Sequence, residues 1–444
     1  MIQTNILIIS GVRGDTSRYR SVHLAEQARM VGMQVTLSHI WETGLLKLAR
    51  KNKFGLVVFQ RVEMDRFVSR LLVELKASKA LCLYDTDDLV FDPKIIGSID
   101  SPDFADPIRL SLYRKAMARQ KDMLLACDGV LVSTKALAES VRALQKPVSI
   151  HHNAFSFEMN ILAEEAFAQR NNIPNRIVLG YASGTHTHDR DFSLVKSALL
   201  GLLDTYPEVE VWMIGQLDPG NGWERYGSRV RQIQKVDWRE LPNYLAQFDI
   251  NLAPLVSGNP FSESKSAIKF MEAALLRCPT VASPCGEFRE AIEDGVNGIL
   301  SDIDDWTDKL VRLVEDSGLR KRIGTKAYED VIRTYHPSVR CVELVKSLND
   351  LSFEVRGQKI FREQDVHSSH ILEQDSPLQE SYAGNAEYDA PSDLQRGWVS
   401  LWRRGPFELL GNIWVFIRRV IAPLFPFRNE LIEAKASETK RNHR

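Results

Sequence analysis

Two lysines and a glutamate at helical spacing form the candidate site with the clearest chemistry. Lys265, Lys269 and Glu272 lie four and three residues apart, just after the helix-start signal Asn259-Pro260. Residues at these spacings share one face of a helix, so their side chains are expected to gather near its N-terminus. Two ammonium groups beside the positive end of the helix dipole favour a diphosphate, and the carboxylate can accept hydrogen bonds from a ribose diol. A solvated helix face with ordinary charge pairing is the alternative interpretation.

A turn rich in Gly, Ser and Thr, residues 180–192, is expected to add contacts to the phosphates. It follows a predicted strand and opens a predicted helix, and such turns expose backbone N–H groups that bind anions. The candidate donor-binding residues in this turn are Gly184, His188 and Arg190. A polar loop with helix-capping residues is the alternative interpretation.

The first half of the chain offers carboxylates instead of lysines. Asp85, Asp87 and Asp88 stand where a predicted strand ends. Taken alone, an Asp-x-Asp pair suggests a divalent metal ion that bridges a pyrophosphate. We discount a metal site because the lysines already provide a place for the phosphates. We expect Asp87 or Asp88 to complete a ligand cleft, with helix capping as the alternative.

Three arginines follow the first predicted strand. Arg13, Arg18 and Arg20 lie in and just after a Gly-x-x-Gly loop, which alone is weak evidence of a phosphate site. They are expected on the acceptor side, where guanidinium groups would clamp a phosphate or an anionic acceptor. Surface arginines without a ligand are the alternative.

Short apolar strands alternate with amphipathic helices twice along the chain, which indicates two doubly wound α/β domains. Near-continuous apolar runs are typical of strands buried on both faces of a parallel sheet. The strands are expected at residues 6–10, 56–60, 80–85, 129–133 and 147–151, then at 177–182, 209–215, 249–253 and 280–283. We predict Rossmann-like domains at 1–155 and 173–350, with a helical connector at 155–174. Ligands bind at the carboxyl ends of such strands, so a cleft is expected between the domains.

Size and composition are consistent with two domains. The chain has 444 residues, of which 44% are hydrophobic and 26% charged. The formal net charge of −1 excludes a global attraction to nucleic acid. Five cysteines form no CxxC pair and no zinc spacing, which indicates reduced thiols in a cytosolic protein. A cytoplasmic location is expected, because the sequence shows neither a signal peptide nor a stretch of about 18 apolar residues.

The composition changes after residue 352. Residues 353–395 carry nine acidic and three basic residues and few large aliphatics, which predicts an acidic disordered linker. Residues 396–444 mix arginine with aromatic and aliphatic side chains, which predicts a basic amphipathic tail. Its segment 396–427 could associate peripherally with the inner face of a membrane, or dock on the chain itself or on a partner subunit.

The second half of the chain resembles the retaining GT-B glycosyltransferases of family 4, the glycosyl transferases group 1. The matching motifs are Glu272-Ala273-Ala274, then Cys278-Pro279-Thr280-Val281-Ala282-Ser283, then Gly286-Glu287 and the loop at 293–300, in the family's order. Residues 265–274 are similar to a subgroup that reads Lys-Ser-x-x-Lys-Phe-x-Glu-x-Ala. The sequence departs from the family's Glu-x7-Glu pair, because Ser264 replaces the first glutamate.

The resemblance implies roles for particular residues. It implies that Glu272 binds the donor ribose, and that Lys265 and Lys269 provide much of the donor contact beside Ser264. It places Val236 and Trp238 in the loop whose backbone reads the nucleobase, with a packing role as the alternative for Trp238.

The activity that the resemblance implies is a sugar transfer with retention of anomeric configuration, in cell-surface polysaccharide biosynthesis. The donor would be a UDP-, GDP- or ADP-sugar and the acceptor a glycan or a lipid-linked glycan, with no obligatory metal or other cofactor. Lys265, Lys269, Asp87 and Asp88 are the candidate catalytic residues, since cations can stabilise the departing diphosphate and a carboxylate can orient the acceptor. The alternatives are a nucleotide-sugar epimerase and a non-catalytic subunit that binds a sugar nucleotide or a glycan.

Overall fold

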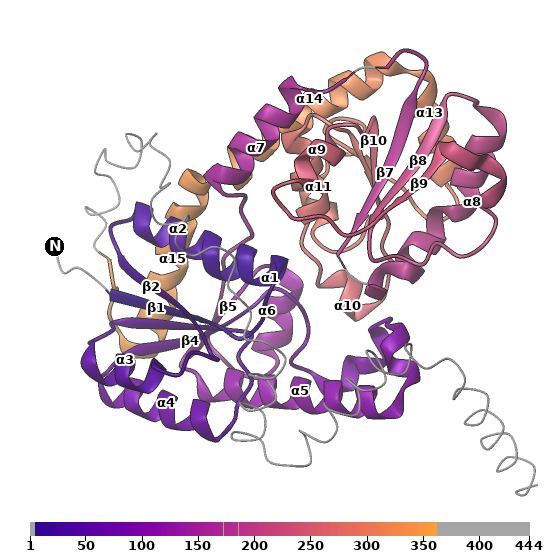
Figure 1. Cartoon of the computed structure of the whole chain (residues 1–444). Coiled ribbons are helices and arrows are strands. Elements are labelled where there is room, and N and C mark those ends of the chain that lie inside the picture. The colour runs from indigo at the N-terminus through magenta and orange to yellow at the C-terminus, as the bar shows by residue number, and fades with distance from the viewer. Residues whose placement is uncertain (1–4, 172, 185, 362–444) are drawn as a thin grey trace, which may run out of the picture.

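The computed structural model describes residues 5–171, 173–184 and 186–361, which form two α/β domains, each around a six-stranded parallel sheet. Figure 1 shows the first domain in indigo and purple and the second in magenta to orange, joined by long helices. The prediction of two doubly wound α/β domains is confirmed. None of the described helices is both long enough and apolar enough to cross a membrane.

The first sheet has the order β2-β1-β3-β4-β5-β6. Its strands are β1 Asn5–Ser10, β2 Gln34–His39, β3 Leu56–Gln60, β4 Leu81–Thr86, β5 Gly129–Val132 and β6 Val148–Ile150. Strand β2 lies on one side of β1, and the chain then crosses to the other side of β1 to form β3. The switch point of the sheet therefore lies between β1 and β3. Ligands bind at such a point, beyond the carboxyl ends of the strands.

Helices cover both faces of this sheet. They are α1 Asp15–Ser17, a π-helical turn Arg18–Val22, α2 His23–Met30, α3 Leu45–Lys51, α4 Arg66–Ala77, α5 Pro107–Ala126 and α6 Lys135–Arg142, with 3-10 turns at Pro93–Ser98 and Pro102–Ala105. The side chains of Asp65, Asp106 and Thr134 accept backbone N–H bonds at the starts of α4, α5 and α6. These caps satisfy amides that have no partner inside the helix, and so fix where each helix begins.

The second sheet has the order β12-β11-β10-β7-β8-β9, with its switch point between β7 and β10. Its strands are β7 Ile177–Ser183, β8 Val209–Gly215, β9 Val230–Ile233, β10 Ile250–Ala253, β11 Thr280–Ala282 and β12 Ile299–Leu300. The helices of this domain are α8 Asp189–Thr205, α9 Leu241–Leu245, α10 Pro260–Glu263, α11 Ile268–Leu275, α12 Phe288–Ala291, α13 Trp306–Glu315 and α14 Ser317–Tyr335, with 3-10 turns at His186–His188 and Glu224–Arg229.

Two helices connect the domains. Helix α7, Phe157–Ala168, lies in the segment predicted as a helical connector. Helix α15, Pro337–Arg356, follows the second domain but packs on the first, where Leu344, Leu348 and Leu351 join a core cluster with Ile6 and Ile8. Figure 1 shows α15 in orange beside α2, β1 and β2. The chain therefore crosses between the domains twice, and the two crossings restrain the domains relative to each other.

The described part of the linker predicted at 353–395 is ordered by contacts with α15. Residues 353–356 are the last turn of that helix, which ends at Gly357 in the left-handed conformation. The backbone N–H of Phe361 donates to Asn349 Oδ1 at 2.8 Å. The prediction of disorder from residue 353 is wrong for these first residues, because the helix continues. The rest of the linker and the tail at 396–444 lie outside the described residues.

The nine predicted strands agree with the structure to within one residue at either end. Three strands were not predicted, namely β2, β9 and β12. Strands β2 and β9 lie at the edges of their sheets, where side chains are half-buried or exposed and the apolar run is broken. Strand β12, the third, has two residues, too few to form a pattern.

Candidate functional site

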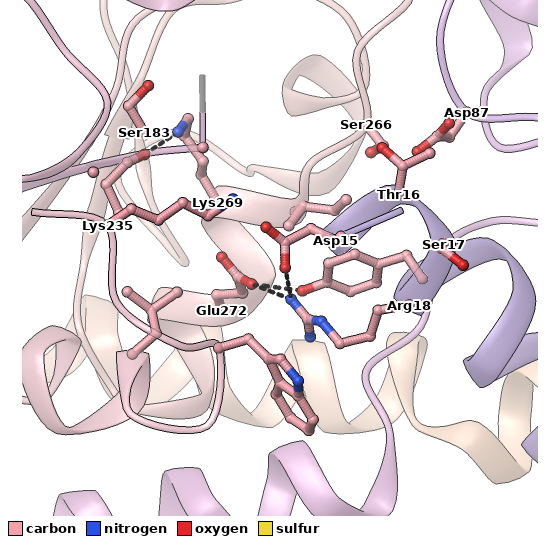
Figure 2. A pocket seen from close by; sticks show the side chains of 18 of the residues that line it. Asp15, Thr16, Ser17, Arg18, Asp87, Ser183, Lys235, Ser266, Lys269 and Glu272 are labelled. Atoms are coloured by element: carbon pink, nitrogen blue, oxygen red, sulfur yellow. Dashed lines mark hydrogen bonds and ion pairs between the residues drawn. The ribbon is translucent and has the colours of Figure 1, made fainter. Parts of the chain in front are cut away.

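A cleft of about 550 Å³ lies between the carboxyl ends of the two sheets. The first domain contributes the segment from Arg13 to Tyr19 and the pair Asp87 and Asp88, and the second contributes the ends of β7 and β8, residues 235–239, and α11 with the residues before it. Figure 2 shows Asp15 and Arg18 of the first domain facing Glu272 of the second, with Lys235 and Lys269 on the second domain's side. Both switch points therefore open into one space.

Lys269 lies in α11 with its ammonium group buried in the cleft. It donates to the carbonyl oxygen of Ala182 at the end of β7, and its Nζ lies 4.7 Å from the ring centre of Tyr181. Burial lowers the pKa of Lys269 to about 8, against the opposing effect of Glu272 and Asp191. A desolvated ammonium group gains more from an incoming anion than a solvated one does, so this position suits a phosphate.

Glu272, one turn further along α11, is held by residues of the first domain. Tyr19 donates a 2.6 Å hydrogen bond to Glu272 Oε1, and Arg18 Nη2 lies 3.7 Å from the same oxygen. Burial raises the pKa of the Glu272 carboxyl above its ordinary value, while Arg18 and Tyr19 oppose the rise. A buried carboxylate that accepts from one hydroxyl can accept from another, so a diol can take the place of Tyr19.

Trp238 is covered on its ring by arginines. The guanidinium carbon of Arg18 lies 4.7 Å from the ring centre and that of Arg239 lies 4.5 Å from it. Arg18 also lies 4.4 Å from the Tyr19 ring and pairs with Asp15 at 2.9 Å. Arginine–aromatic stacking of this kind fixes the arginine in place. The geometry favours the packing alternative for Trp238, while Lys235, Val236 and Asp237 line the cleft.

Lys265 and Asp88 make a direct contact across the cleft. Nζ of Lys265 lies 2.7 Å from Oδ1 of Asp88, while Oδ2 of Asp88 lies 3.3 Å from Nη1 of Arg61. Burial would raise the pKa of the Asp88 carboxyl, but Lys265 and Arg61 outweigh it and hold the pKa below its ordinary value. Asp88 is therefore an ionised group between two cations, with one cation from each domain.

Asp87 has a different environment from its neighbour Asp88. It lines the cleft, 8% of its surface is exposed, and its Oδ1 has no hydrogen-bond partner among the residues described. Burial and the charge of Asp88 raise the pKa of Asp87 to about 6. A carboxyl group that lines a cleft and has a pKa near neutrality is suited to accept a hydroxyl proton.

His188 lies at the start of α8, on the rim of the cleft. Its Nδ1 donates to Asp191 Oδ2 at 2.9 Å, because a carboxylate can only accept. Burial lowers the pKa of His188, and Lys269 and Lys265 lower it further. The lowered pKa favours the neutral ring, with Nδ1 as the donor to Asp191, so that Nε2 can accept from a hydroxyl.

Most of the predicted site residues lie together. The cleft is lined by Arg13, Arg18, Asp87, Asp88, Gly184, His188, Val236, Trp238, Lys265, Lys269 and Glu272. The expectation that Lys265 shares a helix face with Lys269 is wrong in detail, because α10 ends at Glu263 and α11 begins at Ile268. Lys265 lies in the link between them, and this link lets its side chain reach the first domain.

Arg20 is not on the acceptor side of the cleft, contrary to the prediction. Its Nε and Nη2 lie 3.0 Å and 2.5 Å from the two oxygens of Asp85, and both side chains are fully buried. Nη1 donates to the His151 carbonyl at 2.7 Å and to Asn153 Oδ1 at 3.2 Å. The π-helical turn directs Arg18 into the cleft and Arg20 into the first domain. Arg20 is therefore a structural residue that ties β4 to the end of β6.

Two further predicted residues lie outside the cleft. Ser264 is buried, its hydroxyl donates to the Phe261 carbonyl at 2.7 Å, and its own carbonyl accepts from Thr134 at 3.1 Å. Arg190 is exposed in the first turn of α8, beside a small side pocket that adjoins the cleft at His188 and Lys265. Neither residue lies where it would contact a donor bound in the cleft.

Four site residues escaped the sequence analysis, namely Asp15, Tyr19, Arg61 and Lys235. Tyr19 stands between Arg18 and Arg20 in the sequence, but its partner Glu272 lies 253 residues away. Arg61 directly follows β3, the position that a switch point between β1 and β3 makes functional. Knowing the strand order would therefore have identified Arg61 as a candidate.

No group of three or more potential metal ligands occurs in the part of the chain that the structure describes. The carboxylates that suggested a metal are instead paired with the chain's own cations. Asp85 pairs with Arg20, and Asp88 pairs with Lys265 and Arg61.

Comparisons with known proteins agree with this geometry. Residues 176–316 match the family model described as glycosyl transferases group 1. No curated protein matches the chain. Among solved structures, the chain is similar to a sucrose-phosphate synthase from Thermosynechococcus elongatus, with 14% identity over 78% of this chain and 98% of that one and a TM-score of 0.55.

Two further solved structures have the same fold. Anabaena HepE, solved in complex with UDP and glucose, is 14% identical over 78% of this chain and 99% of that one, with a TM-score of 0.52. A glycosyltransferase from Rickettsia africae is 12% identical over 80% of this chain and 99% of that one, with a TM-score of 0.55. These likenesses establish the GT-B arrangement of two Rossmann-like domains.

Proposed function

The chain belongs to the glycosyl transferases group 1 and is a glycosyltransferase, and from that premise we propose that its donor is a UDP-sugar. The diphosphate lies against Lys265 and Lys269, and the ribose diol takes the place of Tyr19 at Glu272. The nucleobase lies against the backbone of residues 235–237. Support for uracil comes from Anabaena HepE, which has the same fold and was solved with UDP and with UDP-glucose.

The observation that carries the proposal is the placement of Lys269. Its ammonium group is buried beside the carboxyl end of β7, one helical turn from the carboxylate of Glu272 and inside the same cleft. As the bond between the sugar and the diphosphate breaks, negative charge develops on the departing oxygen. Preorganised cations in a site that excludes water stabilise this charge strongly.

The acceptor side of the proposal rests on Asp87. Its carboxyl group lines the cleft, in the domain that faces the donor lysines. We assign the acceptor hydroxyl to this carboxyl group, with a glycan or a lipid-linked glycan as the acceptor and retention of anomeric configuration in the product. The pathway would be cell-surface polysaccharide biosynthesis, as the resemblance of the sequence to its family implies.

A thermal-shift screen tests the donor. UDP, GDP, ADP and their common sugar conjugates are added separately to the wild type, to Lys269→Ala and to Lys346→Ala, an exposed lysine on α15 that serves as the matched control. A ligand that binds the native state raises the melting temperature by mass action. We expect UDP compounds to raise it in the wild type and the control, with the shift lost in Lys269→Ala. Stabilisation by GDP or ADP instead, or an equal shift in Lys269→Ala, would contradict the proposal.

A second proposal concerns location. We propose that the enzyme is cytoplasmic and associates peripherally with the inner face of the membrane through residues 396–427, whose composition suits a membrane interface. Sedimentation of the full chain with vesicles containing anionic lipid, compared with a chain ending at residue 395, tests this. Equal recovery of both chains with the vesicles would exclude it.

A further inference from the structure

Arg61 occupies a fixed position at the switch point of the first sheet. It directly follows β3, its backbone has φ of 48°, and its N–H donates to the Asp85 carbonyl at 2.9 Å. A Cβ at Gly11 would lie 2.5 Å from the carbonyl oxygen of Arg61, so only glycine at position 11 allows the loop after β1 to pass this close. The left-handed conformation is unfavourable for arginine, and the surrounding contacts must maintain it.

The side chain of Arg61 lies between two adjacent carboxylates. Its Nη1 is 3.6 Å from Asp87 Oδ1 and 3.3 Å from Asp88 Oδ2, and 14% of the side chain is exposed. Two carboxylates this close repel each other, and burial makes ionisation of both unfavourable. A shared guanidinium group offsets part of that repulsion and fixes the geometry of the pair.

We propose that Arg61 is a positioning residue for the acceptor hydroxyl, an inference that rests on the proposed function. By bridging the two carboxylates, Arg61 keeps Asp88 directed at Lys265 and holds the carboxyl group of Asp87 at the wall of the cleft. The two aspartates thus have different roles, because Asp88 contacts the donor domain and Asp87 receives the acceptor hydroxyl. Arg61 acts through Asp87 and does not contact the sugar.

The charged surroundings determine how this pair titrates. The groups that act on Asp87, Asp88 or Arg61 are Arg20, Tyr84, Asp85, Tyr113, His188 and Lys265. Arg61 lowers the pKa of Asp87, whose value of about 6 results from burial and from Asp88. Removing the guanidinium group should therefore raise that pKa further, so that Asp87 is protonated at a higher pH.

The test compares Arg61→Gln and Arg61→Lys with the wild type in two assays. The first is UDP affinity, and the second is the rate of UDP release from UDP-glucose between pH 5 and 9, with water as the acceptor. The affinity of Arg61→Gln for UDP should stay within about twofold of the wild-type value. Its rate of UDP release from UDP-glucose should be about tenfold lower at pH 7, and the acidic limb of its pH–rate profile should lie at least about half a pH unit higher. In Arg61→Lys, which keeps the positive charge, the acidic limb of the pH–rate profile should lie at the wild-type pH.

Two results in these assays would overturn the proposal. One is an Arg61→Gln variant whose rate of UDP release and whose acidic limb both equal those of the wild type. The other is a slow rate in Arg61→Gln whose pH profile is unshifted, because that describes a merely structural residue.

A stability cycle tests the bridge without relying on activity. Melting temperatures of the wild type, Arg61→Gln, Asp87→Asn and the double variant are measured at pH 7.5 and at pH 4.5. At pH 7.5 the double variant should melt at least about 2 °C above the temperature that adding the two single effects gives, since Arg61→Gln leaves Asp87 without its neighbouring cation and that cost disappears when Asp87 is also uncharged. At pH 4.5, where Asp87 is protonated, the effects should add. Additivity at both pH values would overturn the bridge, and a wild type that neither binds nor releases UDP would instead overturn the proposed donor.

Discussion

Lys265 in the second domain donates a 2.7 Å hydrogen bond to Asp88 in the first, and both residues line the cleft. The lysine assigned to the donor diphosphate is therefore already paired across the cleft. A bound diphosphate and Asp88 compete for the same ammonium group. Donor affinity should consequently depend on a residue of the opposite domain.

Asp88→Asn tests this competition. The substitution removes a negative charge near the diphosphate and weakens the hold on Lys265, so UDP should bind about three- to tenfold more tightly, the size of one partly screened charge contact. The rate of sugar transfer should fall, because Asp87 loses its fixed neighbour. Calorimetric titration with UDP measures the affinity. Asp350→Asn, in the exposed pair with Lys346, is the control, and equal or weaker binding by Asp88→Asn would count against the competition.

Glu272→Gln tests the ribose contact. The amide keeps the shape of the side chain but loses the charge that strengthens a hydrogen bond from a hydroxyl. The affinity for UDP should fall by about ten- to hundredfold, which corresponds to the ~1.5–3 kcal/mol of a charged hydrogen bond. The affinity for 2′,3′-dideoxy-UDP should not change. If both ligands lose affinity equally, Glu272 acts on something other than the ribose.

Arg20→Met tests the structural role of the buried pair with Asp85. It leaves a buried carboxylate without its partner, which typically costs ~3–5 kcal/mol and should lower the melting temperature by about 6 °C or more. Arg50→Met, in a pair where half of the arginine side chain is exposed, should leave the melting temperature nearly unchanged. UDP binding by the folded fraction should persist. Loss of UDP binding without loss of stability would contradict the structural role and would mean that Arg20 belongs to the binding site.

Lys269 should make UDP binding sensitive to alkaline pH. Burial lowers its pKa from 10.5 to about 8, so in the free protein the ammonium group loses its proton as the pH rises through that value. Above pH 8 UDP must bind with proton uptake, and its affinity should fall by up to about tenfold between pH 7.5 and 9.5. Calorimetry in two buffers with different ionisation enthalpies measures the protons. Lys269→Arg, which stays charged, should bind UDP without proton uptake. Proton uptake that persists in Lys269→Arg would have to come from another group.

Much of the fold could be predicted because parallel strands buried on both faces leave long apolar runs. Strands β3 and β8 were predicted to the residue for this reason. Strand β2 was missed because it lies at an edge and begins with exposed or half-buried residues. The crossing of α15 back to the first domain could not be predicted, since its apolar face does not reveal which sheet it covers.

The candidate site was predictable where its residues are close in the sequence. Lys269 and Glu272 share a helix, so their spacing placed them together. Arg18 and Arg20 are two residues apart, and their opposite directions depend on a π-helical turn that no residue pattern marks. Arg61 meets Asp88 through the order of the strands, and Tyr19 meets Glu272 through the closing of two domains. These contacts follow from tertiary structure, which local patterns do not encode.

The central claim is that the ammonium group of Lys269 holds the phosphates of a UDP-sugar. Its most direct test is calorimetric titration of the wild type, Lys269→Ala and the control Lys346→Ala with UDP and with uridine at pH 7. We predict that Lys269→Ala weakens UDP binding by at least about tenfold, the loss of one charged contact, and leaves uridine binding unchanged. UDP binding that is equally tight in Lys269→Ala, or absent from the wild type, would contradict the assignment.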